Sequence, residues 1–175
     1  MNYFELYDLP ISFNPDQNVV KKQFYALSKK YHPDFYINET AEKQDEVLEL
    51  STLNNKAFQI LKDPQKRLQY ILELKDQVKE GENYALPQDF LMDMMDVNET
   101  LMDLEFEPNS EKLASIKKEI EDFEQSLNAE LNQHTTKFDT VTTAEQEEVL
   151  KTIKDIYYRH KYLWRIKQSL ARIAS

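Results

Sequence analysis

The sequence predicts an all-α protein with a small helical hairpin domain followed by a three-helix bundle. Glycine is almost absent, with one in 175 residues, whereas hairpin turns and glycine-lined phosphate loops need backbone positions with positive φ. Apolar residues recur every three or four positions along most of the chain, which is the spacing of one helix face. The hydrophobic content of 41% is sufficient for packed cores in a chain of this length.

Composition also excludes several kinds of site and partner. The chain has no cysteine, which excludes disulfides, thiolate zinc sites, cysteine-ligated clusters and thiol catalysis. The histidines His32, His134 and His160 fall on separate predicted elements, so we expect no metal site and no cofactor, with His160 satisfied on a helix seam. The net charge of −10 disfavours nucleic acid or a membrane surface as a partner. Because neither a signal peptide nor a span of ~18 apolar residues is found, we expect a cytoplasmic protein.

The first quarter of the chain predicts two helices. A short helix covers residues 3–8 and is ended by Pro10. The second helix opens with Asn14 as its cap and Pro15 at its first helical position, and it ends at Pro33. Its apolar stripe consists of Val20, Phe24, Leu27 and Tyr31.

A longer helix is predicted from about Thr40 to Leu61, antiparallel to the second helix and joined to it by an exposed loop. Its buried side is predicted to contain Leu50, Leu53, Ala57, Phe58 and Leu61. A short helix over 65–74 follows Asp63 and Pro64, and a polar stretch with the single glycine, Gly81, comes next. We therefore predict one domain over 1–73, a linker over 74–86 and a second domain over 87–175.

Three long helical patterns predict that the second domain is a three-helix bundle. The third of them opens at Thr142 or Thr143, each followed three residues later by Glu or Gln as in a capping box. The predicted seams are Phe90, Met94, Val97, Leu101 and Leu104 on the first helix, Leu113, Ile116, Ile120, Phe123, Leu127 and Leu131 on the second, and Val149, Ile153, Ile156, His160, Leu163 and Leu170 on the third.

The tripeptide His32-Pro33-Asp34 lies between the paired helices. By itself, such a tripeptide is usually only a turn, because proline ends a helix and aspartate binds neighbouring backbone N–H groups. A hydrolase could use His32 and Asp34 as an acid/base pair, but no nucleophile, metal cluster or phosphate cradle accompanies them. We therefore do not expect an enzyme.

Charge is distributed unevenly along the chain and suggests two different partners. The helix before the tripeptide carries four lysines against one acid between residues 16 and 31, namely Lys21, Lys22, Lys29 and Lys30. Residues 82–107 contain eight acids and no lysine or arginine.

The first 73 residues resemble the J-domain of DnaJ-like co-chaperones. The resemblance rests on a lysine-bearing helix, a His-Pro-Asp loop and a third helix ending "KAFQILKDPQKRLQY". The matching positions outside the lysines and the loop are Tyr3, Phe4, Leu6, Asn55, Ala57, Phe58, Leu61, Asp63, Pro64, Arg67 and Tyr70. The resemblance implies that the loop and the lysines bind the ATPase domain of a DnaK/HscA-class chaperone. Phe35 is a departure, because J-domains usually place a lysine there.

The helix after Pro87 has a second apolar face opposite its predicted seam. This face contains Leu91, Met92, Met95, Met102 and Phe106. It could be covered between the two domains, or it could be a partner-binding patch, where methionines adapt to another protein's surface. Tyr158 and Tyr162 on the last helix could join such a patch.

The acidic segment "DFLMDMMDVNETL" following a J-domain looks like the HscB-type co-chaperones of iron–sulfur cluster assembly. The resemblance implies that the bundle binds an IscU-like scaffold protein and delivers it to the chaperone, whose ATPase the loop stimulates. Carried over by position, the scaffold-binding residues are Leu91, Met92, Met95, Asp96, Glu99 and Tyr162. A J-domain co-chaperone with a different client is the alternative.

Overall fold

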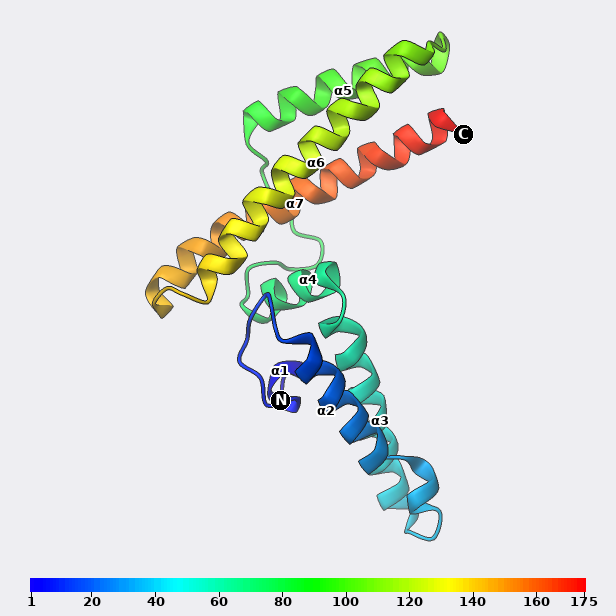
Figure 1. Ribbon diagram of the computed structural model, residues 1–175, viewed down its shortest axis with the longest axis vertical. Helices are drawn as coiled ribbons and strands as arrows, with labels where there is room; N and C mark the ends of the chain where they lie inside the picture. Colours follow the sequence, from blue (N-terminus) through cyan, green and yellow to red (C-terminus); the bar gives the residue numbers. More distant parts are fainter. The chain divides into compact units, whose positions relative to one another are not determined.

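The computed structural model describes residues 1–175, which form α-helices and one 3₁₀ helix without any strand (Figure 1). The prediction of an all-α fold is confirmed. The chain divides into two compact units, Met1–Asp76 (unit 1) and Gln77–Ser175 (unit 2).

Unit 1 is built around an antiparallel pair of helices, with two shorter helices beside them (Figure 1). Its helices are α1 (Tyr3–Leu6), α2 (Gln17–Lys30), the 3₁₀ helix η1 (Pro33–Tyr36), α3 (Ala41–Leu61) and α4 (Pro64–Leu74). The prediction that Asn14 caps α2 is wrong, because Asp16 occupies the cap and its side chain accepts a hydrogen bond from the backbone N–H of Asn18. Asp16 is as good a cap as asparagine, so the helix begins after Pro15 rather than at it.

The interior of unit 1 combines apolar packing with buried polar groups. The rings of Phe24 on α2 and Phe58 on α3 stack with centroids 4.0 Å apart. Asn54 of α3 is buried and donates to the Phe24 carbonyl and to Ser28 Oγ, both at 3.1 Å. The hydroxyl of the buried Tyr7 donates to Asn54 Oδ1 at 2.8 Å. Asn54 therefore joins both paired helices to the segment that follows α1.

A buried arginine in unit 1 links α4 to the end of α3 and to the segment before α2. Arg67 of α4 donates from Nε to the Phe13 carbonyl at 2.9 Å and from Nη1 to the Leu61 carbonyl at 2.7 Å. Burial lowers the pKa of its guanidinium. Since Leu61 is the last residue of α3, the guanidinium satisfies a carbonyl that the helix leaves free.

Unit 2 is a three-helix bundle of α5 (Gln88–Phe106), α6 (Ser110–Phe138) and α7 (Thr143–Ala174). The five predicted seam residues of α5 are all buried. With 19 residues, α5 is much shorter than α6 with 29 and α7 with 32, so it covers one end of the α6–α7 pair (Figure 1). Thr142 and Glu145 form the capping box that begins α7.

The segment before α5, predicted as part of a linker, is attached to α7. Tyr84 stacks on Tyr158 with centroids 4.6 Å apart, and its hydroxyl donates to Asp155 at 2.8 Å. Glu82 accepts hydrogen bonds from Lys154 and Tyr158, both at 2.7 Å. These hydrogen bonds lower the pKa of the Glu82 carboxyl. The chain from Glu82 onward is therefore part of the bundle's surface.

Candidate partner-binding surfaces

The His-Pro-Asp loop is held in one geometry by side chains at both of its ends. On the α2 side, Tyr36 Oη donates to the Lys30 carbonyl at 2.8 Å. On the α3 side, Gln44 Nε2 donates to the carbonyls of Ile37 at 3.1 Å and Glu39 at 3.0 Å. The tripeptide is therefore an exposed but ordered feature.

His32 and Asp34 do not have the arrangement of a catalytic pair. His32 Nδ1 accepts a hydrogen bond from the Asp34 backbone N–H at 3.2 Å, which requires that this nitrogen carry no proton. The same nitrogen lies 3.7 Å from Asp34 Oδ2, a separation that would be an ion pair only with a protonated imidazole. We favour the backbone hydrogen bond, because it is shorter and is the usual cap of a helical turn. Both side chains are exposed, and no third group orients the imidazole as a general base requires.

The four lysines lie on the exposed side of α2. At about 100° per residue, Lys21, Lys22 and Lys29 fall within one third of the helix circumference, and Lys30 lies further round. None of the four takes part in an ion pair within the chain, so their charges are available to a partner. Since α2 ends at Lys30, this positive surface leads directly to the loop.

Phe35 is the apolar departure in the loop. Its side chain is 69% exposed, and its ring meets the His32 ring edge-on with centroids 5.9 Å apart. The position therefore presents an apolar ring against the imidazole where a lysine would present a charge.

The second face of α5 is exposed. Met92 is 63% and Met95 65% exposed, Asp96 and Glu99 are exposed beside them, and Leu91 is half-buried. The predicted patch is thus an apolar surface with acidic neighbours. Figure 1 shows α5 at the edge of the bundle rather than between α6 and α7.

The structure brings Tyr162 of α7 to the edge of this face. Its ring packs edge-on against Phe90 with centroids 6.0 Å apart, and its hydroxyl accepts a hydrogen bond from Asn98 Nδ2 at 3.5 Å. Asn98 is seven residues after Leu91 and so lies almost directly below it on the helix. Tyr158 does not join the patch, because its ring and hydroxyl are engaged by Tyr84 and Glu82.

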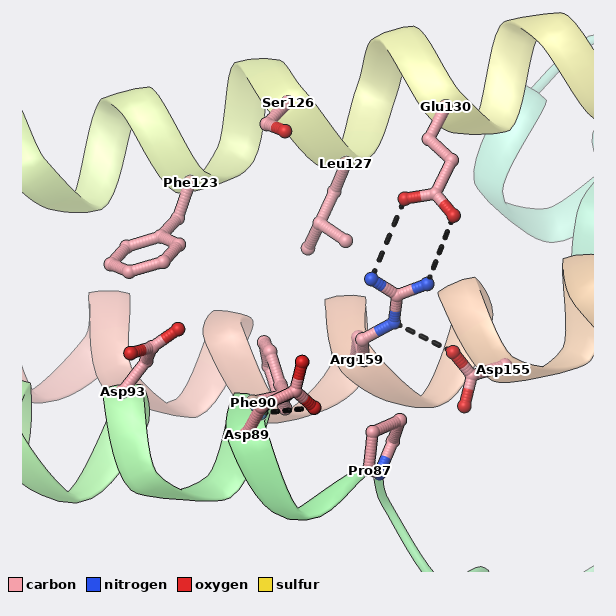
Figure 2. Close-up of a pocket in the computed structure, with 10 residues that line it drawn as sticks. All are labelled: Pro87, Asp89, Phe90, Asp93, Phe123, Ser126, Leu127, Glu130, Asp155 and Arg159. Carbon is pink, nitrogen blue, oxygen red and sulfur yellow. Dashed lines mark hydrogen bonds and ion pairs between the residues drawn. The ribbon is translucent and has the colours of Figure 1, made fainter.

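A charged cleft of about 380 Å³ lies on another side of α5. Figure 2 shows Arg159 of α7 extending between Glu130 of α6 and Asp155. The Arg159 guanidinium lies 3.2 Å from Glu130 Oε1 and 2.7 Å from Asp155 Oδ2. Asp89 and Asp93 of α5 complete the acidic lining. Sequence reasoning missed this cluster, although the spacing of four between Asp155 and Arg159 is a known helical ion-pair signal.

The pKa of Tyr84, which binds the cleft residue Asp155, is also shifted. Burial and the hydrogen bond to Asp155 raise the pKa of Tyr84 to about 12. Because Asp155 binds both Arg159 and Tyr84, it joins the segment before α5 to the ion pairs of the bundle. We interpret the cleft as a structural junction.

The remaining histidines lie in the bundle. Burial lowers the pKa of His160, and its Nε2 is buried without a hydrogen-bond partner. The expectation of a satisfied histidine at this position is therefore wrong. Nδ1 of His134 is in the same state. No group of three or more metal-binding side chains comes together in the structure, and none of the helices has the length and apolar character to cross a bilayer.

Comparison with known proteins identifies both units. Residues 3–70 match the family model of the DnaJ domain, and residues 86–171 match that of the HSCB C-terminal oligomerisation domain. The co-chaperone protein HscB homolog of Haemophilus ducreyi is 37% identical over 138 residues, covering 75% of this chain and 80% of the relative. The chain belongs to the HscB co-chaperone family. The HscB homolog of Pasteurella multocida is 35% identical over 133 residues, covering 75% of this chain and 77% of the relative.

Solved HscB structures have the same fold. Chaperone HscB from Vibrio cholerae is similar with a TM-score of 0.62 and 27% identity, covering 99% of this chain and 98% of that one. Human co-chaperone protein HscB has a TM-score of 0.67 at 24% identity, covering 98% of this chain and 81% of that one. The resemblance to HscB-type co-chaperones is confirmed, and the relatives are named co-chaperones rather than enzymes. The individual binding residues stay predictions.

Proposed function

We propose that this HscB-family protein binds an IscU-like iron–sulfur scaffold protein through unit 2 and presents it to a DnaK/HscA-class chaperone through unit 1, stimulating that chaperone's ATPase. One observation carries the proposal: the two units expose surfaces of opposite chemistry. Unit 1 has unpaired lysines next to an ordered His-Pro-Asp loop. Unit 2 has an apolar methionine face among carboxylates.

On the chaperone side, the lysine surface of α2 favours an acidic partner surface. Such complementarity mainly raises the association rate and sets orientation. Because Tyr36 and Gln44 already fix the loop, little conformational entropy is lost when His32-Pro33-Asp34 is bound. The loop then acts as a ligand that shifts the chaperone toward its hydrolysing conformation, and the chemistry stays in the partner.

On the scaffold side, Leu91, Met92 and Met95 supply an apolar contact that unbranched methionines can fit to another protein. Asp96 and Glu99 flank it and favour a partner with lysine or arginine at the rim. Tyr162 closes one edge from α7. The bundle core is packed by the other face of α5, so these three side chains are not needed for it.

ATP turnover tests the loop. The protein is added to its cognate chaperone, and steady-state hydrolysis is followed with wild type and with His32→Gln. We expect His32→Gln to abolish the stimulation, because the loop loses its imidazole, while scaffold binding by unit 2 is unchanged. Equal stimulation by the two proteins would show that the loop is not the chaperone ligand.

Calorimetry tests the methionine face. We expect the Leu91→Ala/Met92→Ala/Met95→Ala variant to lose most of its affinity for the scaffold, since removing central anchors of an interface costs about 2 kcal/mol or more each. Trp164→Ala is the matched control, because Trp164 is an exposed apolar side chain on α7 outside the face. Unchanged scaffold affinity in the triple variant would refute this assignment. Chaperone stimulation without any scaffold binding by wild type would indicate a different client.

A further inference from the structure

The exposed apolar line on α5 extends beyond the residues assigned above. Met102 is 60% and Phe106 87% exposed, and both follow Met95 on the same helix. At about 100° per residue, Leu91, Met95, Met102 and Phe106 fall within an arc of about 60°. At about 1.5 Å per residue, the line runs for about 22 Å, from the first turn of α5 to its last residue. Singly exposed apolar side chains are common, but four on one arc, interrupted only by the half-buried Asn98, mark an interaction surface.

The charges along α5 describe the partner that this row fits. The helix carries six acidic residues and no basic one: Asp89, Asp93, Asp96, Glu99, Asp103 and Glu105. The last turn has no basic residue, although the helix dipole favours cations there and opposes Asp103 and Glu105. A partner with lysine or arginine at this end would relieve that opposition.

We propose that the scaffold-binding face continues through Met102 to Phe106, with Phe106 as an aromatic anchor at its distal end. The occupant is then a scaffold surface with an apolar ridge about 20 Å long, edged by lysine or arginine on the side that meets Asp103. This inference rests on the proposed function and names the chemistry of its partner.

Interface size supports the extension. A specific interface takes about 20–30 residues from each partner, whereas the assigned positions are six and cover about two and a half turns of α5 plus one contact from α7. A single aromatic residue covers about 150–250 Å² on burial, and aromatic anchors dominate binding energy. Phe106 is the most exposed aromatic among the exposed large hydrophobic side chains.

A second copy of this chain fits the face poorly. In a two-fold symmetric dimer the same patch meets itself, so the carboxylates of one α5 would approach those of the other. Like charges placed together across an interface are strongly unfavourable. With no cation on α5 to alternate with the acids, the charge pattern favours a different, basic-rimmed protein.

The test uses the full chain and calorimetric titration with the apo scaffold protein. We expect Met102→Gln/Phe106→Gln to raise the dissociation constant for the scaffold by about tenfold or more. Stimulation of the chaperone ATPase in the absence of scaffold should be unchanged. Trp164→Gln is the matched control and should bind as wild type. Because both side chains point to solvent and glutamine is a good helix former, circular dichroism should show an unchanged melting temperature.

The outcomes separate this inference from the proposed function. Wild type that binds no scaffold would overturn both. Scaffold binding that is lost in the Leu91→Ala/Met92→Ala/Met95→Ala variant but unchanged in Met102→Gln/Phe106→Gln would overturn the extension alone. A wild-type dimer in sedimentation that becomes monomeric in Met102→Gln/Phe106→Gln would assign the face to a second copy and would also overturn it.

Discussion

The two units are stabilised by different kinds of interaction. Unit 1 places buried hydrogen-bonding side chains, Asn54 and Arg67, between its helices, whereas unit 2 packs long apolar seams and keeps its ion pairs, such as Arg159 with Asp155, near the surface. Directional hydrogen bonds specify one arrangement of the helices, which suits a unit that must hold a short loop in one geometry. Apolar seams tolerate side-chain variation, which suits a unit that presents a broad face.

The largest expected effect is a cavity in unit 2. Met94 is fully buried in the bundle core, and Met94→Ala should lower the free energy of unfolding by about 2–5 kcal/mol. Hydrogen exchange followed by mass spectrometry would locate the loss in α5, α6 and α7. Met95→Ala, at an exposed neighbour, should change stability by less than about 0.5 kcal/mol. Equal loss of protection in α2 and α3 would contradict the division into two separately packed units.

A slightly smaller effect is expected when the polar network of unit 1 is broken. Asn54→Ala removes the hydrogen bonds of the Asn54 side chain with the Phe24 carbonyl, Ser28 Oγ and the Tyr7 hydroxyl, each contributing about 0.5–1.5 kcal/mol. The Tyr7 hydroxyl keeps the Asn54 backbone carbonyl as its acceptor, at 3.1 Å. We expect a total loss of roughly 2–4 kcal/mol, confined to unit 1 in the same exchange measurement. Asn55→Ala, at the exposed neighbour, is the control. If Asn54→Ala is as stable as wild type, the contrast between the two units is wrong.

The smallest effect is a pH dependence specific to unit 2. Burial lowers the pKa of His160 below its ordinary 6.5, so the unfolded chain takes up a proton at higher pH than the folded one. The stabilising contribution of His160 is therefore complete above about pH 6.5 and is lost as the pH falls toward its folded pKa, with a slope of at most about 1.4 kcal/mol per pH unit.

Charged groups on α6 and α7 also act on the pKa of His160. Glu124 of α6 favours the protonated imidazole, whereas Arg159 and Lys167 of α7 disfavour it. Urea unfolding at pH 7.5 and 5.5, compared between wild type and His160→Gln, measures the effect. Wild type should lose more stability than the variant on acidification. An identical loss in both would assign the pH dependence to other groups.

Periodicity alone located most of the apolar core. The buried seam of α5 was predicted residue by residue, because apolar side chains recur at helical spacing. The same helical spacing placed Met92 and Met95 on the opposite side of the helix, where the structure exposes them. The His-Pro-Asp motif and its lysines were equally readable, because their meaning depends on neighbours close in sequence.

Contacts between segments distant in the chain could not be predicted from the sequence. Asn54 was not among the residues predicted on the buried side of α3, and only the fold places the Tyr7 hydroxyl 2.8 Å from it, 47 residues away in the chain. Tyr158 was expected beside the methionine face, and its actual partners, Glu82 and Tyr84, lie in a segment predicted to be a linker. Polar partners of this kind carry no periodic signal.

The sequence by itself determined the helical class, the two differently charged surfaces and the apolar seams, because each depends on spacing along a single helix or on composition. The tertiary structure decided which polar side chains are buried, how Tyr36 and Gln44 order the loop, and that Tyr162 borders the α5 face. The physical reason is that a hydrogen bond between distant segments exists only after packing has brought its donor within about 3 Å of its acceptor.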